Sequence, residues 1–331
     1  MTAPSPLTST NAALITRARV WKDAGHDVAL AFVMKTWGSS PHPVGSVMVI
    51  RGDMAVEGSV SGGCVEGAVI DAAIESLASG TGRRLDFGVA DAQAWEVGLS
   101  CGGRIAVLVT PVANGGLPAA ALAELADDMA ARRPGTVSFD AGNGTKIDRS
   151  IDSDDGMSML SDDEKNFTFC QLPPRRILIV GGVHITQFLA PMAQQAGYDV
   201  VIIDPRAVFS AAARFPDSTC LTAWPDEAMD ELGLDSRSAV VTLTHDPKID
   251  DPGIQAALAS KVFYIGCLGS RRTHAARCER LLQAGFSDND LARLHGPVGL
   301  DIGARTPAEI AVSILAQIIA CETAAEEATG R

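Results

Sequence analysis

The chain has 331 residues, 47% of them hydrophobic, and a formal net charge of -13 at pH 7. This length is sufficient for two domains with buried cores, and the negative charge argues against nucleic acid or an anionic membrane as the main partner. No apolar run approaches the ~18 residues of a membrane span, and residues 1–11 lack a signal-peptide pattern. The seven cysteines are irregularly spaced, which is typical of reduced thiols, so we expect a cytoplasmic protein.

The first half of the chain is interpreted as a mixed α/β region. Its hydrophobic patterns predict helices over 11–24, 65–77 and 118–132, and strands over 27–36, 45–50, 105–109, 135–140 and 166–171. The acidic segment 152–164 is interpreted as a solvated loop. Pro173 and Pro174 hold the chain extended, so we expect one domain over residues 1–172 and a second over residues 173–331.

A lone cysteine stands in a glycine-rich segment before the helix expected over 65–77. The segment reads Gly58-Ser59-Val60-Ser61-Gly62-Gly63-Cys64-Val65-Glu66-Gly67. Its paired glycines allow a tight turn that brings backbone N–H groups close to a bound group. A thiol at a helix N-terminus favours the thiolate, which suits a soft metal, a sulfur atom or a phosphorylated ligand. The alternative is that Cys64 is a small buried hydrophobic side chain.

A second cysteine, Cys101, precedes the paired glycines Gly102 and Gly103 and the strand expected over 105–109. Neither this cysteine nor Cys64 belongs to a Cys-x-x-Cys or Cys/His set with zinc-ligand spacing. The sequence leaves open whether the two form a disulfide, because that depends on geometry. Paired glycines beside both cysteines favour a functional role over packing.

After the prolines, strands and helices alternate, which predicts a parallel sheet with helices on both faces. Strands are expected over 177–180, 199–203, 239–243 and 262–265. The last helix begins after Thr306, with Pro307 at its first position and Glu309 completing a capping box. The expected fold class is therefore α/β, with an N-terminal mixed α/β domain that bears the cysteines and a Rossmann-like C-terminal domain.

Ligands of doubly wound sheets bind beyond the carboxyl ends of the strands, and several polar segments follow the expected strands. The candidate cofactor-binding residues there are Gly181, His184, Asp204, His245, Asp246, Gly269, Ser270 and Arg271. The glycine turn that leads into a helix start at Ser270 and Arg271 predicts a seat for a phosphate. Asp204 stands where an acidic residue would meet a ribose hydroxyl.

The dinucleotide fingerprint G-x-G-x-x-G is degraded in this half. Val183 occupies the position of its second glycine, and the third glycine is missing at Thr186. Tight NAD(P) binding is therefore disfavoured, although the fold remains that of a nucleotide-binding domain. The histidines His184, His245 and His274 either line a pocket or act as structural hydrogen-bonding groups.

Five motifs together resemble the XdhC/CoxI family, at residues 58–67, 100–104, 243–246, 264–277 and 299–311. The resemblance implies an accessory chaperone, without turnover of its own, that binds the molybdenum cofactor as molybdopterin or its cytosine dinucleotide form. It also implies that the chaperone supports sulfuration of the cofactor together with a cysteine desulfurase. Delivery to an apo-molybdenum hydroxylase of the xanthine, aldehyde or carbon monoxide dehydrogenase type would follow.

In this resemblance Cys64 is the essential cysteine, as a ligand of the metal or a relay of sulfur, and Cys101 takes the second cysteine position. The residues around them that would contact the cofactor are Gly62, Gly63, Glu66, Gly102 and Gly103. The chain departs from many members at Gly181-Gly182-Val183-His184, where they have Gly-Ala-Gly-His. Two alternatives remain: an NAD(P)-dependent oxidoreductase that uses the second domain, and a docking protein without a ligand. A homodimer is compatible with the sequence.

Overall fold

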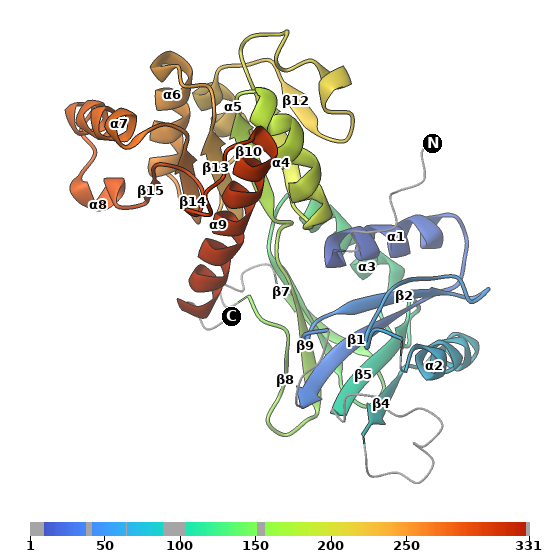
Figure 1. Ribbon diagram of the computed structural model, residues 1–331. Helices are drawn as coiled ribbons and strands as arrows, with labels where there is room; N and C mark the ends of the chain where they lie inside the picture. The colour runs from blue at the N-terminus through green and yellow to red at the C-terminus, as the bar shows by residue number, and fades with distance from the viewer. Residues whose placement is uncertain (1–9, 38–41, 64, 89–103, 151–155, 329–331) are drawn as a thin grey trace. The chain divides into compact units, whose positions relative to one another are not determined.

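The computed structural model describes residues 10–37, 42–63, 65–88, 104–150 and 156–328 (Figure 1). The chain divides into two compact units, Met1–Pro173 and Pro174–Arg331. Each unit has its own hydrophobic core and is described by itself.

The first unit contains two antiparallel sheets and three helices within its described residues. One sheet has the order β3-β2-β1-β5-β4, formed by β1 (Val28–Trp37), β2 (Val47–Arg51), β3 (Val56–Gly58), β4 (Arg83–Phe87) and β5 (Arg104–Pro111). The other has the order β7-β6-β9-β8, formed by β6 (Gly135–Asp140), β7 (Lys146–Ser150), β8 (Met159–Leu160) and β9 (Asn166–Gln171). The helices are α1 (Asn11–Asp23), α2 (Glu66–Ser79) and α3 (Ala119–Ala130).

The central strand β1 separates two parts of this core, because successive side chains of a strand point to opposite faces. Leu30 and Phe32 pack with α1, α3 and the second sheet, where the ring of Phe169 lies 4.8 Å from that of Phe32. Ala29 and Ala31 pack on the opposite face, against α2. The helix that follows Cys64 is therefore held on the sheet by its buried face.

The second unit is built on a six-stranded sheet of order β12-β11-β10-β13-β14-β15. Its strands are β10 (Arg176–Val180), β11 (Asp199–Ile203), β12 (Thr219–Leu221), β13 (Ser238–Thr242), β14 (Tyr264–Cys267) and β15 (Leu294–His295), and every pairing is parallel. The order reverses beside β10, so the switch point lies between β10 and β13. In such sheets the ligand crevice lies at the carboxyl ends of these strands.

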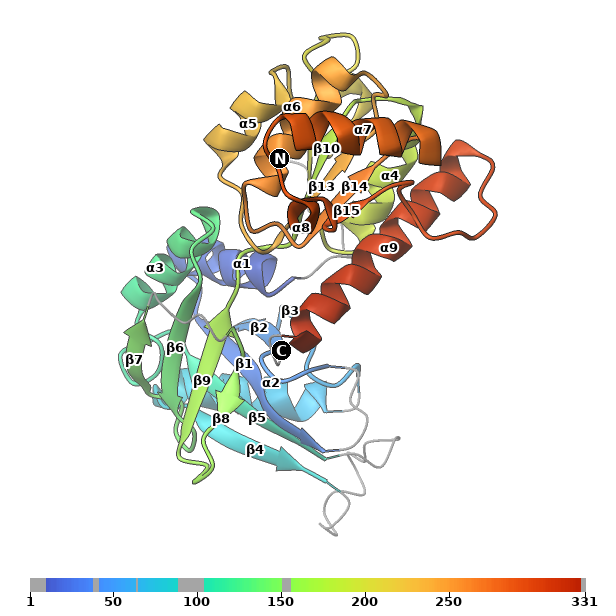
Figure 2. The ribbon, with the colours of Figure 1, turned by 90° about the vertical axis from the view of Figure 1, so that its left-hand side faces the viewer.

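Helices cover both faces of this sheet, and they are α4 (His184–Gln195), α5 (Pro225–Leu232), α6 (Pro247–Leu258), α7 (Arg271–Gln283), the short α8 (Asp288–Leu291) and α9 (Pro307–Ala328). Ile177 and Ile179 of β10 share one core with α4 and α9. Leu178 and Val180 share the other with α5, α6 and α7. Figure 2 shows the sheet between α5 and the pair formed by α4 and α9. This alternation is that of a doubly wound sheet, which confirms the expected α/β fold class.

Residues Pro307–Ala325 of α9 are long and apolar enough to cross a membrane when only length and composition are considered. Glu309 and Glu322 lie within this segment, so it is not an uninterrupted apolar run. Ala311, Ile314 and Ile318 of α9 are buried in the core of the second unit. A core helix passes the same test, so this feature does not by itself assign a membrane span.

Two expectations from the sequence need correction. The acidic segment 152–164 is not wholly a loop, because Met159 and Leu160 form β8 and pair with β9. The strand expected over 262–265 begins at Tyr264 and runs to Cys267. The last helix begins as expected, since Glu309 accepts from the Thr306 backbone while Thr306 Oγ1 accepts from the Glu309 backbone.

Candidate functional site

The turn before α2, formed by residues 59–63 and 65 and called here the α2 turn, folds around the carboxylate of Glu66. Oε1 accepts from Ser59 Oγ at 2.5 Å and from the backbone N–H groups of Val60, Ser61 and Gly62 at 3.2, 2.9 and 3.1 Å. Oε2 accepts from Ser61 Oγ at 2.6 Å and from the N–H groups of Gly63 and Val65 at 2.8 and 3.2 Å. Five backbone donors and two hydroxyls therefore converge on one side chain.

The local backbone allows this convergence because Gly62 and Gly63 both adopt positive φ angles, 81° and 116°. Only glycine takes up such angles without strain. Burial raises the pKa of Glu66, but hydrogen bonds from Ser59, Ser61 and the backbone outweigh that effect and lower the pKa to about 2. Glu66 is therefore ionised at neutral pH, and its charge occupies the anion-binding position that the glycines create.

Four of the predicted site residues, Cys64, Cys101, Gly102 and Gly103, lie outside the described residues, so their roles stay predictions. Their neighbours can be placed: Gly63 and Val65, on either side of Cys64 in the sequence, both donate to Glu66. Within the ranges that the structure describes, no group of three or more His, Cys, Asp and Glu side chains is arranged to hold a metal ion. The assignment of Cys64 to a metal also stays a prediction.

In the second unit, the turn after β10 (residues 181–183, the α4 turn) is filled by the chain itself. Gly181 has a φ of 107°, and a Cβ there would lie 2.7 Å from Thr244 Cγ2. A Cβ on Gly182 would lie 2.0 Å from the carbonyl oxygen of Phe209. Arg214 holds this approach by donating to the carbonyls of both Gly182 and Phe209. The glycines therefore allow the loop after β11 to pack against the turn, and they do not leave the turn open to a ligand.

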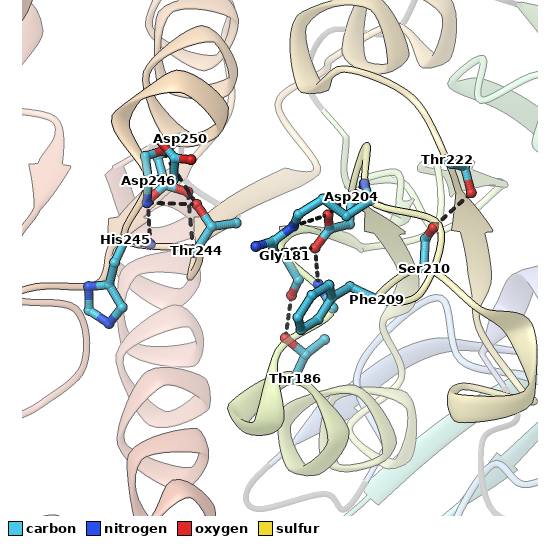
Figure 3. Close-up of polar contacts among 12 residues, drawn as sticks. Gly181, Thr186, Asp204, Phe209, Ser210, Thr222, Thr244, His245, Asp246 and Asp250 are labelled. Carbon is cyan, nitrogen blue, oxygen red and sulfur yellow. Dashed lines mark hydrogen bonds and ion pairs between the residues drawn. The ribbon is translucent and has the colours of Figure 1, made fainter.

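Asp204, at the end of β11, is fully buried, and its hydrogen bonds are drawn in Figure 3. Oδ2 accepts from Gly182 N at 3.0 Å and from Arg206 Nη2 at 2.8 Å, while Oδ1 accepts from Arg206 N and Nε at 3.0 and 2.8 Å. Burial raises the pKa of Asp204, and the contacts with Arg206 and Gly182 lower it further than burial raises it. Both carboxylate oxygens are thus occupied by hydrogen bonds within the protein, whereas a ribose diol would need them as acceptors.

The turn after β13 (residues 244–246, the α6 turn) is held by another carboxylate. Asp250, which is 1% exposed, accepts from Thr244 Oγ1 at 2.7 Å, Thr244 N at 3.3 Å and His245 N at 3.1 Å. These bonds hold His245 at a φ of 63°, and Figure 3 shows its ring pointing away from Asp250. Asp246 caps α6 by accepting from Lys248 N at 3.0 Å. Burial is the main influence on Asp250 and raises its pKa.

The turn after β14 (residues 269–272, the α7 turn) leads into α7. Ser270 caps the helix by accepting from Thr273 N at 3.2 Å, and Gly269 has a φ of 143°. Arg271 and Arg272 are exposed at the first helical positions. The sequence identified Ser270 and Arg271 but missed Arg277, which is 3% exposed and reaches back to the carbonyl of Leu268 at 2.9 Å. Its place in the helix was a usable signal, because long side chains point toward the helix N-terminus.

The three histidines do not share one environment. His184 is exposed at the start of α4 and packs edge-on against Phe188, with ring centroids 5.3 Å apart. His245 is exposed on the α6 turn, whereas His274 lies against Gly296, where a Cβ would be 2.1 Å from Nδ1. Burial and then the charge of Arg277 lower the pKa of His274. Among the described residues, His184 contacts Phe188 and His274 contacts Cys278, and these rings do not contact one another.

The strand order, the helices on both faces and the glycine turns define a protein whose second unit is a Rossmann-like domain. Comparison with known families supports this: residues 177–318 match the XdhC Rossmann domain. Residues 21–88 match the XdhC and CoxI family. The chain belongs to the XdhC/CoxI family.

Similar proteins are known from several bacteria. The chain is 29% identical over 305 residues to the molybdenum cofactor insertion chaperone PaoD of Escherichia coli (strain K12), covering 92% of this chain and 86% of PaoD. It is 24% identical to the uncharacterized protein YqeB of that strain over 92% of this chain, and 34% identical to a probable xanthine dehydrogenase subunit of Bacillus subtilis (strain 168) over 44% of it. The chain spans only 46% and 43% of the lengths of these two relatives.

A solved structure shares the fold of this chain. The crystal structure of a xanthine dehydrogenase from Bacillus halodurans matches with a TM-score of 0.75 and 24% identity, over 94% of this chain and 96% of that one. At this level of identity the match shows the fold alone.

Proposed function

We propose that this protein is a cytoplasmic chaperone that binds the molybdenum cofactor, supports its sulfuration with a cysteine desulfurase and delivers it to an apo-molybdenum hydroxylase. The observation that carries the proposal is the 29% identity to PaoD, a molybdenum cofactor insertion chaperone, over 92% of this chain. The match to an XdhC and CoxI family model in the region that includes Cys64 supports it further.

The chemistry of the α2 turn is compatible with this role. The cofactor is cargo here, and it is an anionic, phosphorylated dithiolene with a soft metal, for which a thiolate is a suitable ligand or sulfur relay. Glu66 orders the residues on both sides of Cys64 through its bonds to Gly63 and Val65. The residues before and after Cys64 are thus held by one carboxylate, which is compatible with the proposed role.

The alternative of an NAD(P)-dependent oxidoreductase receives less support from the structure. Arg206 and Gly182 take up the oxygens of Asp204, and the carbonyl of Phe209 stands over Gly182. A dinucleotide would have to displace these groups before it reached the positions that the Rossmann fingerprint uses. We therefore propose no dehydrogenase activity.

The test is the molybdenum and pterin content of protein purified anaerobically from a cofactor-producing host. Wild type is compared with Cys64→Ala and with Cys220→Ala, a half-buried cysteine of β12 that serves as the matched control. We expect near-stoichiometric cofactor in wild type and Cys220→Ala, and loss of cofactor in Cys64→Ala without unfolding. Absence of cofactor from all three would overturn the chaperone proposal, and equal content in all three would overturn the role of Cys64.

A further inference from the structure

The N-terminus of α7 carries backbone donors that the described protein does not use. α7 has 13 residues, and Ser270 accepts from Thr273 N and, through its carbonyl, from His274 N. The N–H groups of Arg271 and Arg272 precede these and have no partner in the part of the chain that the structure describes. Free N–H groups at a helix start point away from the helix and are suited to an anion.

The charges at this helix start oppose the stability of the helix itself. The first turn contains no acidic residue, and its first two positions are Arg271 and Arg272. Cations there face the positive end of the helix dipole, which destabilises the helix. Among the described residues neither arginine forms an ion pair, although the chain carries a net charge of -13. An anion at this position would remove the conflict.

A buried guanidinium lies beneath the same turn. Arg277 is 3% exposed, and its Nη2 donates to Leu268 O, two residues before the cap of α7. Its Nε and Nη1 have no hydrogen-bond partner within the described ranges. This observation is independent of the helix terminus, because Arg277 comes from the second turn of α7 and is enclosed by protein.

The nearby carboxylates do not supply the missing partner. Asp250 interacts electrostatically with Arg277, but its hydrogen bonds go to Thr244 and His245. Asp251 is paired with Arg280 at 2.6 Å. A buried guanidinium with two nitrogens left without hydrogen bonds is costly, so the positive potential of Arg277 remains available to a ligand at the turn above it.

We propose that the α7 turn, with Arg277 beneath it, binds a phosphate group, as a phosphomonoester or a pyrophosphate. The N–H groups and guanidinium groups of Arg271 and Arg272 would contact the phosphate oxygens, and Arg277 would supply a fixed positive charge behind them. Arginine and helix N-termini are the usual partners of phosphate in proteins. The identification of that phosphate with the one on the molybdenum cofactor rests on the proposed function, whereas the chemistry of the site does not.

The experiment is calorimetric titration of the full-length protein without molybdenum, using inorganic phosphate, pyrophosphate and cytidine 5′-diphosphate at low ionic strength. The variants are Arg271→Ala/Arg272→Ala and Arg277→Gln, and Arg280→Ala is the matched control because it removes an arginine of the same helix outside the turn. We expect each of the first two to weaken pyrophosphate binding about tenfold or more, as for loss of one charge-assisted contact. The control should bind like wild type within about twofold.

The outcomes are decisive even if Arg277→Gln fails to fold, since the exposed double variant tests the same site. Pyrophosphate binding that is absent in wild type, or unchanged in the double variant, would overturn the proposal. Tighter binding of the cytidine diphosphate, lost in the double variant, would identify the nucleotide form as the source of the phosphate. Equal binding of the two would identify the nucleotide-free form.

Failure of this site and failure of the proposed function can be told apart. The titration requires no molybdenum, so pyrophosphate binding that depends on the α7 turn would stand even if the purified protein contained no cofactor. Conversely, a Cys64-dependent molybdenum content with no phosphate binding at α7 would leave the chaperone proposal intact and remove this site.

Discussion

The α2 turn and the α7 turn both contain glycine and both lead into a helix, but their donors have different partners. At the α2 turn, five backbone N–H groups and two hydroxyls converge on Glu66. At the α7 turn, Arg271 and Arg272 take the first helical positions and Arg277 lies below with two unpartnered nitrogens. One turn carries its own anion, and the other carries three cations and no anion.

This difference separates a structural use of the helix N-terminus from a binding use. The same physics attracts an anion in both cases, but a carboxylate in the chain satisfies it permanently at α2. The α4 turn belongs with the first kind, because Asp204 accepts from Gly182 and the loop at Phe209 closes over it. Of these three glycine-containing turns, the α7 turn is therefore the one that would gain most from a phosphate.

The largest expected effect comes from Glu66→Ala, which removes the acceptor of the α2 turn. We expect the free energy of unfolding of the first unit to fall by about 2–4 kcal/mol, less than the sum of its hydrogen bonds because water can reach Gly62 and Gly63. Urea unfolding of the full-length protein measures this. Glu57→Ala is the control, since Glu57 pairs with Arg17 at the surface and should cost about 0.5 kcal/mol or less.

The contribution of Glu66 should also depend on pH in a defined direction. Its pKa is about 2 in the folded protein and 4.5 as a reference value. A lowered pKa means that the stabilisation is complete above the reference value and is lost as the pH falls toward 2. The difference between wild type and Glu66→Ala should therefore shrink over this range, and a difference independent of pH would contradict an ionised Glu66.

The next largest effect is expected from Gly182→Ala, because the new Cβ would lie 2.0 Å from the Phe209 carbonyl oxygen. A backbone carbonyl cannot move aside as a flexible side chain does, so we expect the free energy of unfolding of the second unit to fall by about 2–3 kcal/mol. Gly67→Ala is the matched control: nothing lies within 4 Å of its Cβ position in α2, and alanine should stabilise that helix by about 0.5–1 kcal/mol. A cost below about 0.5 kcal/mol for Gly182→Ala would show that the loop moves aside and leaves the α4 turn open.

The elements whose signals are local could be predicted from the sequence. The strands β6, β9 and β11 have the expected bounds, and the capping box of α9 follows from the spacing of Thr306 and Glu309. α6 was missed because Pro252 lies inside it, and proline removes a helical donor. Short edge strands such as β15, with two residues, carry too little pattern to be recognised.

Several residues of the candidate turns could be singled out from the sequence, but their hydrogen-bond partners could not. Glu66 was identified beside Cys64. Its role arises because its own carboxylate turns back and accepts hydrogen bonds from residues earlier in the chain. Asp204 was identified as a ribose ligand, whereas Arg206, two residues later, occupies it. Arg277 was missed because its place in the helix indicates only the direction of its side chain, whereas its burial arises from tertiary packing.

A smaller effect with a different sign is expected from Arg277→Met, which removes a buried guanidinium that lacks partners for Nε and Nη1. We expect the free energy of unfolding of the second unit to fall by no more than about 1 kcal/mol, or to rise, because an apolar side chain of similar length needs no hydrogen-bond partner. Arg176→Met is the control, since Arg176 is equally buried but donates to Ser238 Oγ and the Gly233 carbonyl. It should lose about 2–4 kcal/mol in thermal or urea unfolding, and equal losses in the two variants would show that Arg277 is structural.

The smallest effect is expected from Asp250→Asn, although Asp250 holds the α6 turn as Glu66 holds the α2 turn. The amide retains the carbonyl oxygen that accepts from Thr244, but its NH₂ group would face the N–H of His245 and lose that bond. Asparagine also removes a carboxylate whose burial raises its pKa, so ionisation at neutral pH destabilises the fold. We expect these effects to offset within about 1 kcal/mol at pH 7, against about 1–2 kcal/mol for the isosteric change Glu66→Gln.

The pH dependence gives Asp250→Asn its sharpest test. A raised pKa in the folded state means that wild type gains stability from Asp250 below the reference pKa of 3.8 and loses it as the pH rises through the folded value. Asparagine should therefore become more favourable relative to aspartate as the pH increases, whereas Glu66→Gln should become less favourable over the acidic range. Urea unfolding at a series of pH values measures both trends. If the two variants followed the same trend, solvent exposure would not distinguish the two turns, because only a buried carboxylate with few donors reverses the direction of the pKa shift.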